Sequence, residues 1–346
     1  MSRPPPSRSW STSRMAAVDY DVLSAARRVI EGSLGLVRGE RVVVVLDSER
    51  QDLADALVEA AQWANATAVC FNLDDLAAPL HELPSAVADA LAKSQASIYV
   101  ARSDSAEVGF RRALIETAAR LGLRHAHLLG MTRATMALGL AADPQRMAAT
   151  ARALRARLRA DSTVALRSAA GSELTVSFVP SHRWVENSGI IRPGRWLNVP
   201  AGELLTAPGS VDGTFVADAS MTRLGGVADE RLAEAPLSLT LAAGRVRHFD
   251  SPSSTVKSAV EAYLSGGRNH DRVGLVSFGT NIGLSEPSGT LIVDQTLPGL
   301  HLCLGMTLPD LTGADWDAGG QIVLTGSRAD IDIDGHAVMR RGRYLI

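Results

Sequence analysis

The stretch from Arg41 to Leu46, which reads RVVVVL, constrains the fold of this chain more than any other. A near-continuous run of β-branched residues is typical of a strand buried on both faces, as in a parallel sheet covered by helices. Apolar residues recur at helical spacing before the run, in residues 22–36, and after it, in residues 52–65. Together these segments predict a buried strand between covering helices.

The same alternation continues downstream. Strands are expected at residues 67–72, 97–101 and 125–129, and helices at residues 83–93 and 108–121. This order indicates a parallel α/β domain, which we place at residues 15–150. The chain contains no G-x-G-x-x-G or Walker pattern, so no nucleotide site is predicted. Residues 1–14, rich in proline, serine and arginine, are expected to form a disordered arm.

The pattern changes after Ser162, where short strand-like runs alternate with glycine and proline turns. Residues 289–295 (GTLIVDQ) read as one of these strands, and residues 254–265 are the one helix expected among them. Residues 143–159 read as an arginine-rich helix that joins the two halves. We therefore predict a two-domain α/β protein whose second domain, residues 160–346, is mixed and largely antiparallel.

Composition and charge argue against two classes of partner. The formal net charge is −2 at pH 7 and no basic stripe is present, so nucleic-acid binding is not expected. No apolar run has the length needed to span a membrane. The two cysteines, Cys70 and Cys303, lie far apart in apolar runs, which fits a reducing compartment better than a disulfide framework. A cytoplasmic protein is expected.

One charged residue stands out in the second half. Residues 197–208 read LNVPAGELLTAP, and Glu203 is the single charge among them. Gly202 beside it allows another part of the chain to approach the backbone closely. A carboxylate on a turn between apolar runs is either a solvated surface group or a ligand directed into a cavity.

This segment resembles the metal-ligating segment of the aminopeptidase T family of metallopeptidases, in which a glutamate at the position of Glu203 binds metal. The 2,5-dihydroxypyridine dioxygenases are similar and hold iron in a related site. The resemblance runs from about Val18 to Tyr344, and it includes residues 171–175 (GSELT), where relatives show a Gly-Thr-Asp-Leu-Thr turn.

The resemblance also locates the remaining metal ligands of the family. His301 matches the histidine of a His-x-Ala-x-Gly motif. The second glutamate falls on Leu275, and a closing His-x-Asp pair falls on Gln321 and Val323. Leucine and valine have no donor atom, and a catalytic zinc needs about three protein ligands. We therefore expect no metal and no other cofactor, and a vacant cavity in which Glu203 and His301 can form a hydrogen-bonded or charge-assisted pair.

Two enzymatic alternatives stay open. An active aminopeptidase or ring-cleaving dioxygenase would need relocated ligands, for which the chain offers His182, His248, Asp250, His270, Asp315, Asp317, Asp330, Asp332 and Asp334. A metal-independent enzyme would use Glu203 and His301 as acid and base.

Tryptophan and arginine residues suggest how a ligand would be held. The residues expected to line a recess beside Glu203, His301 and Gln321 are Trp184, Trp196, Trp316, Arg183 and Arg195. We therefore expect a metal-free protein that binds a peptide or peptide-like ligand. It would present a precursor peptide to a modifying enzyme in the biosynthesis of a ribosomal peptide natural product. The resemblance further implies a homodimer.

Overall fold

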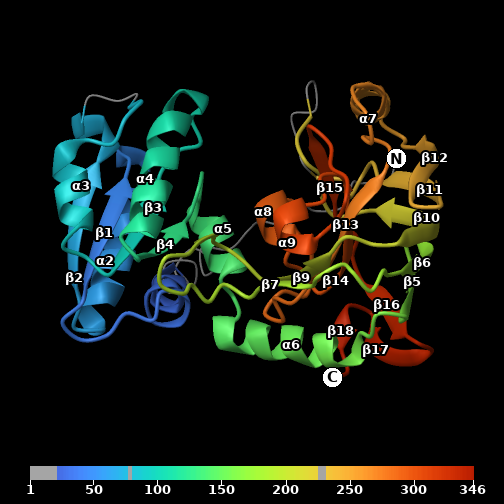
Figure 1. Ribbon diagram of the computed structural model, residues 1–346, viewed down its shortest axis with the longest axis horizontal. Helices are drawn as coiled ribbons and strands as arrows, with labels where there is room; N and C mark the ends of the chain where they lie inside the picture. The colour runs from blue at the N-terminus through green and yellow to red at the C-terminus, as the bar shows by residue number, and fades with distance from the viewer. Residues whose placement is uncertain (1–21, 77–79, 225–230) are drawn as a thin grey trace, which may run out of the picture.

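The computed structural model describes residues 22–76, 80–224 and 231–346. The predicted disordered arm at residues 1–14 lies outside these ranges. Figure 1 shows two assemblies of sheet and helix side by side, with α6 (Pro144–Arg157) running below from one towards the other. None of the helices in the described ranges combines the length and the apolar character needed to cross a membrane.

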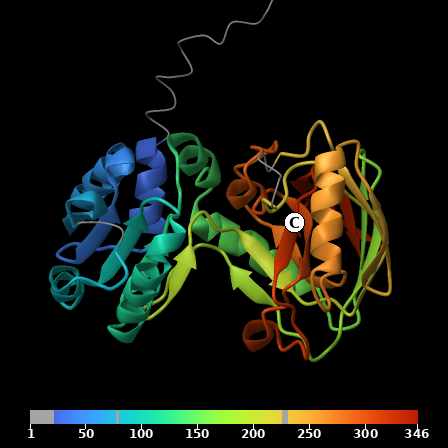
Figure 2. The ribbon, with the colours of Figure 1, turned by 90° about the horizontal axis from the view of Figure 1, so that it is seen from above.

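The N-terminal assembly is built on a parallel sheet. Its strand order is β2 (Thr67–Asn72), β1 (Arg41–Leu46), β3 (Ala96–Val100), β4 (Arg124–His127) and β8 (Trp196–Asn198). Helices lie on both sides of this sheet (Figure 2), which is why the valine run of β1 is buried. The helical segment containing η1 (Arg28–Ser33), together with α2 (Gln51–Trp63) and α5 (Arg133–Gly139), packs on one face; α3 (Ser85–Leu91) and α4 (Val108–Arg120) pack on the other.

The C-terminal assembly consists of two further sheets. One has the order β12 (Arg245–Asp250), β11 (Leu237–Ala242), β10 (Ser210–Ala217), β6 (Glu173–Ser177), β5 (Thr163–Ser168), β16 (Ala329–Ile333), β17 (His336–Arg340) and β18 (Arg343–Tyr344). The other has the order β15 (Gln321–Leu324), β14 (Gly299–Gly305), β13 (Val273–Gly279), β9 (Glu203–Thr206) and β7 (Val185–Asn187). Every strand pair in these two sheets is antiparallel. The two-domain α/β fold class predicted from the sequence is confirmed.

The two antiparallel sheets share one hydrophobic core. Phe215 and Ile331 from the eight-stranded sheet pack in the same cluster as Val276, Phe278 and Leu302 from the five-stranded sheet. Helix α7 (Ser254–Ser265) contributes side chains to the same core. One face of the β7–β9–β13–β14–β15 sheet therefore packs in this core, and the opposite face carries Leu205, Leu275 and Cys303, which form a smaller buried cluster.

One predicted strand is a helix. Residues 289–295 contain α8 (Leu291–Asp294) and not the expected strand. The Asp294 carboxylate accepts hydrogen bonds from the backbone N–H of Ser288 and of Gly289, at 2.6 and 3.0 Å. These bonds close the segment into a turn, so its β-branched residues do not become extended. A second short helix, α9 (Pro309–Thr312), was also not predicted.

The segment at residues 197–208 connects the two assemblies. It leaves the parallel sheet as β8 and enters the antiparallel sheet as β9, with only Val199 to Gly202 between them. Gly202 has φ +139°, and a Cβ there would lie 2.9 Å from Met147 Sδ of α6. Its carbonyl accepts from Thr280 N at 2.8 Å. The glycine beside Glu203 is therefore required by the close approach of three parts of the chain.

Candidate functional site

The five positions that correspond to family metal ligands lie on one face of the antiparallel sheet. Leu275, Cys303 and Val323 are aligned across β13, β14 and β15. Gln321 lies two residues from Val323, and successive residues of a strand alternate between faces. The remaining two positions reach the same face through the register, because Ser277 pairs with His301 and Gly279 pairs with Glu203.

Glu203 is a half-buried acid without a cation beside it. Its Oε1 accepts from Ser277 Oγ at 2.9 Å, and the Asn187 side chain also hydrogen-bonds to the carboxylate. Burial raises the pKa of Glu203 to about 7, although both hydrogen bonds act in the opposite direction. The carboxyl group therefore changes charge near neutral pH, which is a property of many functional acids.

His301 is held in a neutral form on β14, which β13 separates from the strand of Glu203. Its Nε2 lies 2.8 Å from the Leu297 carbonyl oxygen, so Nε2–H is the donor and Nδ1 carries the lone pair. Nδ1 is buried and has no hydrogen-bond partner. Burial lowers the pKa of His301 to about 4. The ring therefore presents a free acceptor to its surroundings.

Glu203 and His301 do not form the expected pair. The register places Ser277 directly between them, opposite His301 on one side and hydrogen-bonded to Glu203 on the other. Because His301 Nδ1 is unbonded and Nε2 is committed to Leu297, no proton passes directly between the two groups. The expectation of a hydrogen-bonded or charge-assisted pair is corrected by this geometry.

The rest of the face is apolar. Leu275 and Cys303 pack with Leu205, and Val323 lies against them. Burial raises the pKa of the Cys303 thiol to about 12, so the sulfur is protonated at neutral pH. Gln321 Oε1 lies 3.7 Å from Cys303 Sγ. This part of the face is therefore a buried apolar cluster.

This donor set does not fit the metal that the resemblance implies. Glu203 and His301 are the two strong donors at the five positions, and Ser277 separates them. Across residues 22–76, 80–224 and 231–346, no group of three or more His, Cys, Asp or Glu side chains is placed to hold a metal ion. A catalytic zinc centre needs about three protein ligands. No step through a metal can be derived from these residues.

The residues considered as relocated ligands are spread over the molecule and have other partners. Asp334 accepts from Thr163 N at 2.8 Å, and Asp332 pairs with Arg340 at 2.6 Å. The other contacts are Asp330 with Arg341 N, Asp250 with Lys257, Asp317 with Thr307 N, His182 with the Ala207 carbonyl, and His270 with the Tyr263 carbonyl. His248 lies on β12, at the outer edge of the other sheet, and Asp315 is exposed.

The three tryptophans expected around Glu203 lie in three different places. Trp184 packs against Phe178 and Phe278, with ring centroids 5.0 and 6.1 Å apart, on the core side of the sheet. Trp316 is covered by the Arg272 guanidinium, 4.1 Å from its ring centre. Trp196 belongs to the parallel sheet.

The two arginines expected in the recess also lie elsewhere. Arg183 donates to the carbonyl oxygens of Leu311 and Asp310, at 2.9 and 2.8 Å, and so stabilises the short helix α9. Arg195 is exposed beside Trp196. The side chains that do surround Glu203, Ser277 and Asn187, were missed in the sequence. Ser277 could have been found, because it follows Leu275 at the two-residue spacing of one strand face.

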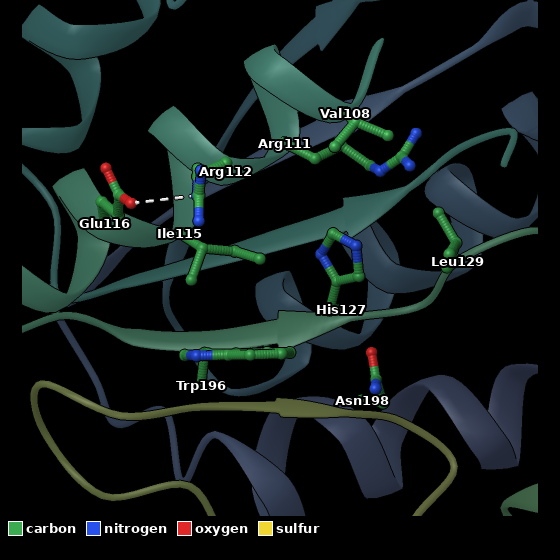
Figure 3. A pocket seen from close by; sticks show the side chains of 9 residues that line it. All are labelled: Val108, Arg111, Arg112, Ile115, Glu116, His127, Leu129, Trp196 and Asn198. Atoms are coloured by element: carbon green, nitrogen blue, oxygen red, sulfur yellow. Dashed lines mark ion pairs between the residues drawn. The ribbon is translucent and has the colours of Figure 1, made fainter. Parts of the chain in front are cut away.

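A cavity of about 430 Å³ lies at the other end of the connecting segment, on the parallel sheet. Figure 3 shows side chains of α4 on one side of it, His127 of β4 in the middle, and Trp196 and Asn198 of β8 below. Of the residues predicted to bind a ligand, Trp196 lines this cavity. His127 was missed, although the His-x-His spacing of residues 125–127 places both rings on one strand face.

Comparisons with known proteins agree on the fold. Residues 22–279 match the profile of the family described as NicX, 2,5-dihydroxypyridine 5,6-dioxygenase. The structure of 2,5-dihydroxypyridine dioxygenase from Pseudomonas putida KT2440 has a TM-score of 0.63 and 16% identity, with 94% of this chain and 97% of that chain covered. Wild-type AmpT from Thermus thermophilus has a TM-score of 0.62 and 17% identity, with 95% and 100% covered. No curated protein sequence matches.

Proposed function

Because the chain belongs to the 2,5-dihydroxypyridine 5,6-dioxygenase family, whose profile it matches over residues 22–279, we propose that it is a member that binds a peptide without metal chemistry. The observation that supports this proposal most is the row formed by Leu275, Cys303 and Val323. Two members of this row, Leu275 and Val323, occupy positions where the resemblance expects metal ligands, and Glu203 lies on the same face.

The proposed recognition combines one charged contact with an apolar surface. A peptide amine has a pKa of roughly 7.7–8.0 and would donate a charge-assisted hydrogen bond to Glu203. The first side chain of the peptide would lie against Leu275 and Leu205, which belong to the apolar cluster of this face. His301 Nδ1, which lacks a donor, would accept an N–H or O–H of the ligand.

The same residues do not provide for hydrolysis. Peptide hydrolysis in metallopeptidases depends on a metal that activates water and polarises the carbonyl group. Glu203 and Ser277 are hydrogen-bonded to each other, and the neutral thiol of Cys303 is a poor nucleophile. A bound peptide would remain intact, which suits a protein that presents a precursor peptide to a separate modifying enzyme, as a homodimer in the cytoplasm.

Calorimetry with peptides tests this proposal. Short peptides with a free amine, their N-acetylated forms and any precursor peptide encoded beside this gene are titrated into the wild-type protein. We expect micromolar or tighter binding to at least one free-amine peptide, weakened about tenfold by acetylation or by Glu203→Gln. The matched control is Glu186→Gln, which alters an exposed carboxylate on the neighbouring strand β7. Mass spectrometry should recover the peptide uncleaved.

Three results would contradict the proposal. The first is release of N-terminal amino acids in the presence of zinc or cobalt, which would favour an active peptidase. The second is an elemental analysis showing about one metal per chain that is lost in Glu203→Ala. Absence of binding to every peptide would likewise reject it. Light scattering at micromolar concentration tests the homodimer separately.

A further inference from the structure

The cavity on the parallel sheet exists because one strand lacks a covering helix. On the face that carries Tyr99, α3 and α4 cover the sheet. Strand β8 joins that sheet beside β4 only after a long excursion of the chain, and it forms the outer edge. A groove is left between α4 and β8, lined by residues of both and by His127 of β4. We call it the α4–β8 groove.

A chain of hydrogen bonds ends in this groove. Ser97 Oγ lies 2.8 Å from His125 Nδ1, and His125 Nε2 lies 3.2 Å from His127 Nδ1. Ser97 and His125 are fully buried, and His127 is 4% exposed. If Ser97 donates to His125, then His125 donates to His127, and each buried donor among these three side chains has an acceptor. The opposite direction would leave the buried hydroxyl hydrogen of Ser97 without one.

The direction of these hydrogen bonds decides which nitrogen of His127 carries the proton that faces the groove. With Nδ1 as the acceptor, the remaining proton of the His127 ring is on Nε2. No contact of the described residues engages Nε2, and the ring lines the groove. Burial lowers the pKa of His125 to about 3 and that of His127 to about 4, so both rings are neutral. The groove therefore has a fixed N–H donor in its floor.

The remaining groups provide positive charge and an aromatic surface. Trp196 is 42% exposed, and its ring meets His127 edge-on at 6.2 Å. Arg112 lines the groove from α4, and its ion pair with Glu116 is long, at 3.4 Å, and exposed on both sides. Such a pair contributes little to stability, so Arg112 can turn to a ligand at small cost. The other groove residues are Val108, Arg111, Ile115, Leu129 and Asn198.

We propose that the α4–β8 groove binds a small aromatic carboxylate. Its ring would lie against Trp196 and the apolar side chains of α4, and its carboxylate would accept from His127 Nε2–H and from Arg112. The volume lies within the range of ligand sites, which is roughly 300–1,000 Å³. The two arginines and Glu116 leave one net positive charge among the lining residues, which favours a single carboxylate. This site is independent of Glu203.

Calorimetry with benzoate tests the groove, with benzamide as the neutral analogue and acetate as the anion without a ring. We expect saturable binding of benzoate and binding at least about tenfold weaker for benzamide and for acetate. Trp196→Ala and Arg112→Gln should each weaken benzoate about five- to tenfold. The matched control is Arg120→Gln, an exposed arginine of the same helix outside the groove.

A further variant tests the N–H donor. His127→Phe keeps a ring in the groove floor and removes Nε2–H, so it should weaken benzoate about tenfold. If this buried variant does not fold, Trp196→Ala and Arg112→Gln decide the question, because both side chains are solvent-accessible. The proposal is overturned if benzamide or acetate binds as well as benzoate, or if Trp196→Ala changes nothing. It is also overturned if Glu203→Gln abolishes benzoate binding, which would locate the ligand at the other site.

Discussion

The α4–β8 groove and the Glu203 face lie at the two ends of one short connection, and burial acts on their titratable groups in opposite directions. Burial lowers the pKa of His127 to about 4, whereas it raises the pKa of Glu203 to about 7. Both shifts favour the uncharged form, since a low-dielectric environment disfavours charge of either sign. In both places burial therefore keeps the titratable group neutral over a wider range of pH.

The largest expected effect concerns the packing of the Glu203 face. Gly279 pairs with Glu203, and a Cβ at this glycine would lie 1.9 Å from the Leu297 carbonyl oxygen. Gly279→Ala should therefore lower the free energy of unfolding by about 3 kcal/mol or more. Gly319→Ala is the control, because a Cβ there meets nothing within 4 Å. Equal urea midpoints for the two variants would show that the face is loosely packed.

Glu203 itself should make the protein less stable as the pH rises. The unfolded chain ionises this acid near 4.5, whereas the folded protein retains the proton until about 7. The free energy of unfolding is therefore highest, as far as Glu203 is concerned, below pH 4.5. It decreases between pH 4.5 and 7 by at most about 3 kcal/mol. Glu203→Gln should remove this loss in urea unfolding at several pH values, and Glu186→Gln should not. An unchanged pH profile in Glu203→Gln would mean that water already solvates the carboxylate.

His127 should produce the opposite trend in the groove. The unfolded chain protonates this histidine below about 6.5, whereas the folded protein resists protonation until about 4. The contribution of His127 to the free energy of unfolding is fully present above pH 6.5, and it falls by about 2 kcal/mol on acidification to pH 5. His127→Phe should reduce the overall fall in stability by the contribution of His127, while the buried His125 and His301 keep theirs. His336→Phe, at an exposed histidine of β17, serves as the control. Parallel pH profiles for the wild type and His127→Phe would show that His127 is not kept neutral by burial.

The smallest effect separates two tryptophans that look alike in the sequence. Trp184 packs in the core with Phe178 and Phe278, so Trp184→Ala should destabilise the protein by about 2 kcal/mol. Trp196 is 42% exposed, and Trp196→Ala should cost less than about 1 kcal/mol. Thermal unfolding of both variants measures the difference. A larger loss for Trp196→Ala would indicate that the groove supports the fold and does not merely receive a ligand.

The elements that could be predicted from the sequence are those with strong local patterns. The β-branched run of β1, the strand-like run of β2 and the periodic helices α2, α4 and α7 formed where the sequence indicated. The end of a strand at Leu197 could be predicted, but the pairing of β8 with the parallel sheet could not, because its partner β4 is far away in the sequence. Residues 289–295 form a turn of helix through the Asp294 hydrogen bonds, a tertiary effect that propensity does not contain.

The candidate site divides in the same way. Leu275 and Val323 lack donor atoms in any conformation, so their chemistry could be read before any geometry was available. The relation between Glu203 and His301 depends on strand register, which places Ser277 between them. The positions of Trp184 and Trp316 depend on which side of a sheet or loop each ring takes. Sequence spacing does not determine that choice across distant strands.

The short connection between β8 and β9 has a consequence for dissecting the protein. The N-terminal core includes Ile191, Leu197 and Val199, which come from the second half of the chain. A fragment that ends after α6 would lack these side chains, and β4 would become an open sheet edge able to pair with other chains. We expect such a fragment to aggregate, so the two assemblies cannot be produced as separate proteins by cutting the gene near residue 160.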